Sequence, residues 1–278
     1  MNRKEAKEMN RINETFARLK REKKAAFIPY ITAGDPDMAA TEKIVLNLAK
    51  AGADIIELGI PFSDPLADGP TIQMAVERSL KAGCTAGKVL SMVRNLRKTV
   101  SVPLVFMTYY NIVLNYGLKR FIKDAKSSGA DGIIVPDLPM EESGGLTALA
   151  DKEDFAVIML TAPTTPHARF KRIAEVSRGF IYYVSLTGVT GARKKLSVKL
   201  KSEVKALKKL TTKPVCVGFG VSNTLQARDI AGAADGVIVG SAIIKTIEKN
   251  LADKSALDKR VTSFAESLAK AIHSVRSR

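Results

Sequence analysis

Short apolar runs recur along the chain, separated by longer segments in which apolar residues return every three or four positions. The runs are nearly continuous rather than alternating, which is typical of strands buried on both faces of a parallel sheet. Eight of them predict strands at residues 26–32, 55–59, 104–108, 132–135, 156–160, 181–185, 215–218 and 236–239. The intervening segments predict amphipathic helices, among them residues 41–50, 118–128, 166–176 and 224–232.

Three of the helices pass into the next strand through a repeated phrase, which reads AGADIIEL, SGADGIIV and AGAADGVIV in turn. Glycine ends a helix at such a place because it accepts a positive φ. Eight consecutive strand–helix units without a low-complexity linker predict one α/β domain over residues 1–278, a closed (β/α)8 TIM barrel. A doubly wound open sheet is the alternative. It is disfavoured because no glycine-rich dinucleotide turn follows the first strand.

Two helical segments lie outside this repeat. Met9, Ile12, Phe16 and Leu19 recur at helical spacing before the first strand. We therefore expect residues 1–24 to form a helical extension that packs on the bottom of the barrel. Residues 256–275 predict a terminal helix on the outside.

The composition suits one sizeable core, since 46% of the residues are hydrophobic. Cys84 and Cys216 stand far apart with no CxxC pattern, so neither a disulfide framework nor a zinc site is indicated, and a reduced cytoplasmic location is expected. No apolar run approaches the roughly 18 residues of a membrane span. The first two dozen residues resemble neither a transit peptide nor a signal peptide.

The net charge of +16 is unevenly distributed, because residues 193–213 hold nine basic residues and one acid, Glu203. A polyanion-binding patch is one interpretation. A solvated helix face near a site for an anionic substrate is the other, and we prefer it because no aromatic residue interleaves the lysines as in single-strand binders. Nucleic acid is therefore not the expected partner.

In a barrel of this kind the active site lies on the loops that follow the strands. Three of these loops are rich in glycine and small hydroxyl residues: GVTGAR after the sixth predicted strand, GFGVS after the seventh and GSA after the eighth. Glycine allows backbone N–H groups to approach a ligand closely, and a helix N-terminus favours an anion. The three loops together predict a phosphate site that includes Gly220, Gly240 and Ser241. The loop with Gly188 and Gly191 could close over the same phosphate.

The candidates for acid–base chemistry are Glu57 at the end of the second strand, Asp68 in the loop after it, and Asp137 after the fourth strand. Apolar neighbours would raise the pKa of Glu57, as a general acid requires near neutral pH. A structural carboxylate that caps backbone donors is the alternative for Glu57. Asp64 is expected to be a turn residue or an interface contact. Asp35 is expected to be a turn or helix-cap residue, with a supporting role in the site left open.

Other chemistries are disfavoured. His167 and His273 are the only histidines and are far apart, so neither a metal site nor a catalytic triad is expected. No lysine ends a predicted strand, which argues against Schiff-base catalysis. A phosphorylated substrate handled by carboxylates without a cofactor remains. An aromatic substrate body would suit the apolar lining expected from Phe27, Tyr30, Met107, Tyr182 and Phe219.

Five motifs resemble one known family, the α subunits of tryptophan synthase. They are FIPYITAGDPD, IELGIPFSDPLADGPTIQ, YYVSLTGVTGAR, GFGVS and IVGSAI, in the family's order, and the similarity runs from about Ile12 to the C-terminal helix. The resemblance implies retro-aldol cleavage of indole-3-glycerol phosphate to indole and glyceraldehyde 3-phosphate. It also implies that Glu57 is the general acid/base at indole C3 and at the glycerol hydroxyl, and that Asp68 stabilises positive charge on the indole nitrogen.

The resemblance further assigns the substrate pocket. Tyr182, Tyr30 and Met107 would line the indole end, and Gly191, Gly220, Gly240 and Ser241 would bind the phosphate. The implied partner is a pyridoxal-phosphate-dependent β subunit in an αββα assembly, which receives indole through a tunnel, whereas this chain would carry no cofactor. The loop around Asp64 would lie near the partner, and residues 188–195 would act as a lid. The basic residues after GVTGAR exceed what this function explains.

Overall fold

The computed structural model describes residues 10–185, 193–218 and 220–275. Eight parallel strands close into a barrel in sequence order, β1 to β8, with β8 pairing back onto β1. The strands are β1 (Ala26–Thr32), β2 (Ile56–Gly59), β3 (Leu104–Met107), β4 (Gly132–Ile134), β5 (Ala156–Thr161), β6 (Ile181–Val184), β7 (Val215–Gly218) and β8 (Gly236–Val239). The predicted TIM barrel is therefore confirmed, and each strand lies within one residue of its predicted range at either end.

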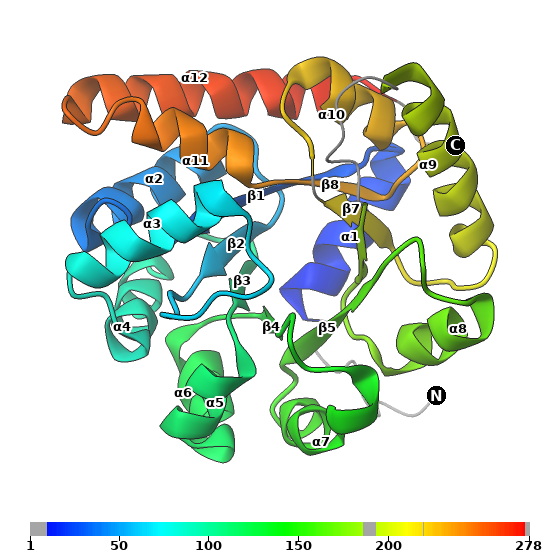
Figure 1. Ribbon diagram of the computed structural model, residues 1–278, viewed down its shortest axis with the longest axis horizontal. Helices are drawn as coiled ribbons and strands as arrows, with labels where there is room; N and C mark the ends of the chain where they lie inside the picture. The colour runs from blue at the N-terminus through cyan, green and yellow to red at the C-terminus, as the bar shows by residue number, and fades with distance from the viewer. Residues whose placement is uncertain (1–9, 186–192, 219, 276–278) are drawn as a thin grey trace, which may run out of the picture.

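Helices surround the barrel on all sides (Figure 1). Those before β5 are α1 (Arg11–Glu22), α2 (Met38–Lys50), α3 (Pro70–Lys81), α4 (Ala86–Leu96), α5 (Tyr110–Tyr116), α6 (Leu118–Ser128) and α7 (Gly144–Lys152), with a short 3-10 turn, η1 (Met140–Glu142). Those after β5 are α8 (His167–Val176), α9 (Arg193–Lys208), α10 (Thr224–Ala231), α11 (Ser241–Glu248) and α12 (Lys254–His273). The last of these packs along the outside against α2, α10 and α11.

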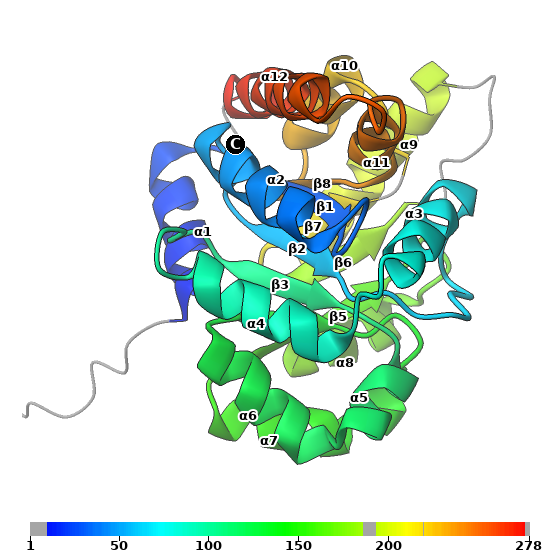
Figure 2. The same cartoon turned by 90° about the vertical axis from the view of Figure 1, so that its left-hand side faces the viewer.

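The N-terminal helix α1 closes the end of the barrel where the strands begin. The side chain of Asn10 accepts a hydrogen bond from the amide of Ile12 and donates to the carbonyl oxygens of Asp131 and Asp154, which precede β4 and β5. The buried face of α1 packs into the barrel interior, where the ring centroids of Phe16 and Phe180 lie 5.8 Å apart. Figure 2 shows α1 at one end of the barrel and the β2–α3 loop at the other.

Alternation along the strands separates an inner core from an outer one. Side chains at every second position, such as Ile28, Val105 and Ile238, cluster inside the barrel with the apolar face of α1. The positions between them pack outward against the helices, as Phe27 does. This period of two decides which side chains near the carboxyl ends of the strands point into the barrel.

Candidate active site

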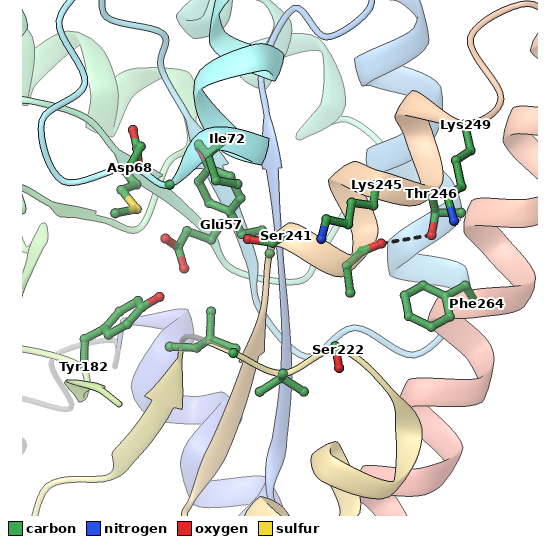
Figure 3. A pocket seen from close by; sticks show the side chains of 18 residues that line it. Glu57, Asp68, Ile72, Tyr182, Ser222, Ser241, Lys245, Thr246, Lys249 and Phe264 are labelled. Carbon is green, nitrogen blue, oxygen red and sulfur yellow. Dashed lines mark hydrogen bonds between the residues drawn. The ribbon is translucent and has the colours of Figure 1, made fainter. Parts of the chain in front are cut away.

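A cavity of about 530 Å³ lies at the end of the barrel where the strands end (Figure 3). Its lining brings together residues that are distant in the sequence. From the predicted site residues it includes Tyr30, Glu57, Asp68, Met107, Tyr182, Gly220, Gly240 and Ser241. Of the eight described strands, β2 alone contributes a charged side chain to this lining, the carboxylate of Glu57. The cavity therefore combines an apolar inner wall with a few polar groups, as ligand sites commonly do.

Glu57 points into the cavity because of its place on β2. In the parallel sheet Glu57 lies opposite Tyr30 on β1 and Val105 on β3. This is an inward-facing position near the carboxyl ends of the strands. Only 1% of its surface is exposed, and neither carboxyl oxygen has a hydrogen-bond partner among the described residues. The expected alternative, a carboxylate that caps backbone donors, finds no donor in the described part of the chain.

The environment of Glu57 favours its neutral form. Burial raises its pKa to about 8, and the negative charge of Asp68 acts in the same direction. A buried carboxyl without a partner is costly when ionised, so Glu57 holds its proton at neutral pH. A protonated carboxyl that faces a cavity is suited to act as a general acid.

Asp68 belongs to the loop between β2 and α3 and is held from the side of β3. The hydroxyl of Tyr109 donates to Oδ2 of Asp68 at 3.1 Å and accepts the amide N–H of Ala67 at 2.8 Å. Burial raises the pKa of Asp68 to about 6, although the hydrogen bond from Tyr109 opposes the shift. At neutral pH the cavity thus holds one protonated carboxyl, Glu57, and one carboxylate, Asp68.

Two tyrosines, Tyr30 and Tyr182, line the cavity, and each requires a glycine on the next strand. A Cβ at Gly218 would lie 2.5 Å from the hydroxyl oxygen of Tyr182, and a Cβ at Gly59 would overlap the hydroxyl of Tyr30. Both phenols are buried, and burial raises the pKa of each well above its usual range. They are therefore neutral, and both contribute to the lining of the cavity.

The other end of the cavity is built from the loop after β7 and the start of α11. Gly220 has a φ of +79°, a conformation that glycine adopts readily. Gly240 precedes α11, and no side chain caps this helix, whereas Asn223 caps the neighbouring α10. Unpaired N–H groups and the helix dipole make the start of α11 favourable for an anion.

Lys245 and Lys249 add positive charge to this end of the cavity, and the sequence reasoning missed both. Lys245 lies one turn beyond Ser241 on α11, and Lys249 is the residue that ends the helix one turn later, so all three line the cavity from one side of the helix. Figure 3 shows Lys245 directed toward Ser241 and Glu57. Neither ammonium has an ion-pair partner in the described part of the chain. The spacing GSAIIK could have revealed Lys245 from its helical period alone.

Some expected residues lie elsewhere. Gly191 and Phe219 fall outside the described residues, as does most of the expected lid. The expectation that Phe27 lines the cavity is wrong. Side chains alternate between the two faces of a strand, and that of Phe27 points outward into the core between strands and helices. Asp137 is not an acid–base candidate, because it is exposed and its carboxylate accepts the amide N–H of Tyr110 at the start of α5.

The remaining acids have structural contacts. Asp64 is exposed and accepts the hydroxyl hydrogen of Ser63. Asp37 rather than Asp35 caps α2, by accepting the amide N–H of Ala40. Asp35 lies in the turn after β1, where its amide N–H donates to the carbonyl oxygen of Thr32, so the expectation of a turn residue is confirmed and that of a helix cap is wrong. Its buried carboxylate pairs with Arg78.

The described residues contain no group of three or more His, Cys, Asp or Glu side chains placed to hold a metal ion. Nε2 of His273 lies 2.8 Å from Oδ2 of Asp54, away from the cavity. None of the described helices is long and apolar enough to cross a membrane.

Comparison with known proteins finds similarity to one family over nearly the whole chain. The family model for the tryptophan synthase alpha chain matches residues 16–273. The tryptophan synthase alpha chain of Geobacter sulfurreducens is 50% identical over 264 residues, which cover 95% of this chain and 99% of the relative. That of Caldanaerobacter subterraneus is 45% identical over 260 residues, covering 94% and 98%.

Solved structures show the same likeness in three dimensions. The crystal structure of tryptophan synthase subunit alpha from Legionella pneumophila superimposes with a TM-score of 0.90 at 39% identity, over 96% of this chain and all of that one. A chain of Mycobacterium tuberculosis tryptophan synthase gives a TM-score of 0.86 at 35% identity, over 96% of this chain and 99% of that one. Sequence and structure agree that this chain belongs to the tryptophan synthase alpha chain family.

Proposed function

We propose that Glu57 and Asp68 divide the acid–base work of the reaction of this family, the cleavage of indole-3-glycerol phosphate to indole and glyceraldehyde 3-phosphate. The chain is accordingly a carbon–carbon lyase of tryptophan biosynthesis. The carrying observation is the buried carboxyl of Glu57, whose oxygens have no partner among the described residues and which faces a cavity whose far end is lined by Ser241 and Lys245.

The first step is a proton transfer to carbon. Glu57, kept protonated by burial, donates its proton to C3 of the indole ring, which makes the ring nitrogen positive. The carboxylate of Asp68 stabilises this charge. Such stabilisation is effective because the acceptor is held in place before the charge develops.

The second step breaks the carbon–carbon bond. Glu57, now ionised, accepts the proton of the hydroxyl on the glycerol carbon attached to C3. The bond between that carbon and C3 breaks, its electron pair returns to the ring and neutralises the nitrogen, and the carbon becomes the aldehyde of glyceraldehyde 3-phosphate. Glu57 is again protonated, so the cycle closes without a net proton.

The two ends of the cavity orient the substrate for these steps. Tyr30, Met107 and Tyr182 would enclose the indole ring at the inner end. Gly220, Gly240 and Ser241 would hold the phosphate at the start of α11, with Lys245 adding charge. Gly191 and Phe219 remain predicted members of the same site.

Release of indole from indole-3-glycerol phosphate by the purified chain tests this function. We expect turnover by the chain alone, faster when a β subunit is present. No indole from either preparation would refute the assignment. High activity of the isolated chain, with no stimulation by a β subunit, would instead identify a lyase that works by itself.

We further propose a β subunit as the partner, in an αββα assembly, with pyridoxal phosphate in that subunit and no cofactor in this chain. The β2–α3 loop supports a docking surface near Asp64, because the neighbouring Leu66 is 92% exposed. A large apolar side chain so exposed is suited to burial by a partner. A cytoplasmic location fits this role.

A further inference from the structure

A buried ion pair, which the proposed chemistry does not use, joins the loop after β1 to α3. Arg78, on α3, donates from Nε to Oδ1 of Asp35 at 2.7 Å and from Nη2 to Oδ2 at 2.9 Å. The side chain of Asp35 is completely buried, and that of Arg78 is 22% exposed. Two parallel hydrogen bonds between planar groups fix both distance and orientation.

Arg78 also reaches a third segment. Its Nη1 lies 3.6 Å from Oε1 of Glu248, at the end of α11. One guanidinium thus joins the β1–α2 loop, α3 and α11. Each of these three segments leads directly to a residue of the cavity lining: Tyr30 on β1, Ile72 on α3 and Ser241 on α11.

The contact between α3 and the β1–α2 loop leaves little room for movement. The hydroxyl of Ser79, next to Arg78, donates to the carbonyl oxygen of Ala33 at 2.5 Å. A Cβ at Gly34 would lie 2.5 Å from the Ser79 hydroxyl oxygen and 2.6 Å from Cβ of Cys84. The helix therefore contacts this loop through two successive residues, Arg78 and Ser79.

The position of α3 sets the position of Asp68. The helix begins at Pro70, only two residues after Asp68, and the side-chain amide of Gln73 donates to the Asp68 carbonyl oxygen at 2.8 Å. The hydroxyl of Tyr109, which follows β3 in the chain, donates to the carboxylate of Asp68. A shift of α3 relative to β1 would move the backbone of Asp68 while Tyr109 stays with β3.

We propose that Arg78 is a positioning residue for the lyase reaction, which anchors α3 to the β1–α2 loop and to α11 so that Asp68 stays in place against the indole nitrogen. The inference rests on the proposed function. It assigns to Arg78 an effect on turnover that passes through Asp68, and no contact with substrate.

Arg78→Lys tests the proposal, because lysine keeps the charge but cannot form the two parallel hydrogen bonds. Arg97→Lys is the matched control. Arg97 pairs with the buried Asp131 at 2.9 Å, at the end of the barrel where the strands begin, far from the cavity. Both changes loosen a buried pair, and the position of Asp68 depends on only one of them.

We expect Arg78→Lys to lower kcat about tenfold, as a small displacement of a catalytic group does. The Kd for glycerol 3-phosphate should change less than about twofold, because that ligand does not touch Asp68. Arg97→Lys should leave kcat unchanged well below its Tm. In an Asp68→Asn background, Arg78→Lys should lower the residual kcat by less than about twofold, the non-additivity expected of residues that act as a unit.

Amide hydrogen exchange provides a readout independent of turnover. The N–H of Ala67, which donates to Tyr109, should exchange faster in Arg78→Lys and not in Arg97→Lys. Glu248→Gln, which changes only the partly exposed partner, should produce the same change to a smaller degree and serves if Arg78→Lys does not fold.

Equal kcat in the two lysine variants, unchanged exchange at Ala67, or an undiminished effect of Arg78→Lys without Asp68 would each overturn the proposal. An inactive wild-type chain would refute the proposed function instead. The exchange measurement would then still decide whether Arg78 orders the Asp68 loop.

Discussion

The hydroxyl of Tyr109 lies 3.1 Å from Oδ2 of Asp68 and donates a hydrogen bond to that carboxylate. The same hydroxyl accepts the amide N–H of Ala67, so it holds both the backbone and the side chain of the loop. Asp68 is held to the segment after β3 through this phenol, and to α3 through its own chain and the side chain of Gln73. Its placement is a property of two strands and a helix that are separated in the sequence.

Replacement of Tyr109 by phenylalanine should weaken catalysis most at low pH. The hydrogen bond from Tyr109 lowers the pKa of Asp68, so its loss should raise that pKa above about 6 and protonate the carboxylate at higher pH. We expect the acid limb of the kcat profile to move to higher pH. Tyr110→Phe is the control, since the described hydrogen bonds of Tyr110 come from its backbone amide. An acid limb at the same pH in both variants would contradict the role given to Tyr109.

Replacement of Glu57 by glutamine should abolish most of the turnover. The amide keeps the shape of the side chain but cannot donate and recover a proton, so kcat should fall by at least the ~10²-fold typical of losing a general acid or base. Indole release at saturating substrate measures the change. A variant with a rate close to wild type would show that another group transfers the proton.

Two carboxyl groups with separated pKa values should give a bell-shaped pH profile. Turnover requires ionised Asp68, with a pKa of about 6, and protonated Glu57, with a pKa of about 8. The rate should therefore rise through about pH 6, peak near neutrality and fall through about pH 8. A rate that keeps rising above pH 9 would be inconsistent with a protonated Glu57 as the acid.

The burial of Glu57 should also make stability depend on pH. Its pKa rises from 4.5 in the unfolded chain to about 8 in the folded protein, so the folded state binds the proton more tightly. Its contribution to stability is fully present below about pH 4.5 and is lost as pH rises toward about 8. Urea unfolding should show the Glu57→Gln variant gaining stability relative to wild type over this range. A constant difference between the two proteins would mean that Glu57 is not desolvated.

Replacement of Lys245 by methionine should weaken binding of the phosphate end of the substrate. A charge-assisted contact is worth about 1.5–3 kcal/mol, so KM for indole-3-glycerol phosphate should rise about tenfold or more. Binding of indole itself, which has no phosphate, should not change. Lys119→Met removes an equal charge from α6, on the opposite side of the barrel from α11 (Figure 1), and should leave KM unaltered. Equal effects of the two variants would reduce the role of Lys245 to net charge.

The fold could be predicted from the sequence because each strand of a parallel barrel is covered on both faces. Such strands are continuous apolar runs, and eight of them followed by helical segments leave few other architectures. Glu57 could be found for the same reason, since a carboxylate at the end of an apolar strand is exceptional. The glycines before α10 and α11 were visible because close approach of a backbone to a ligand requires them.

What the sequence determined by itself is the list of strands and the acid that interrupts one of them. The tertiary structure decided which side chains face each other: Phe27 outward, Asp137 at the start of α5, Tyr109 on Asp68 and Arg78 between three segments. The physical reason is one of range. Burial and backbone preference act on neighbouring residues and leave a local pattern, whereas the partner of a polar group is set by packing between elements far apart in the chain.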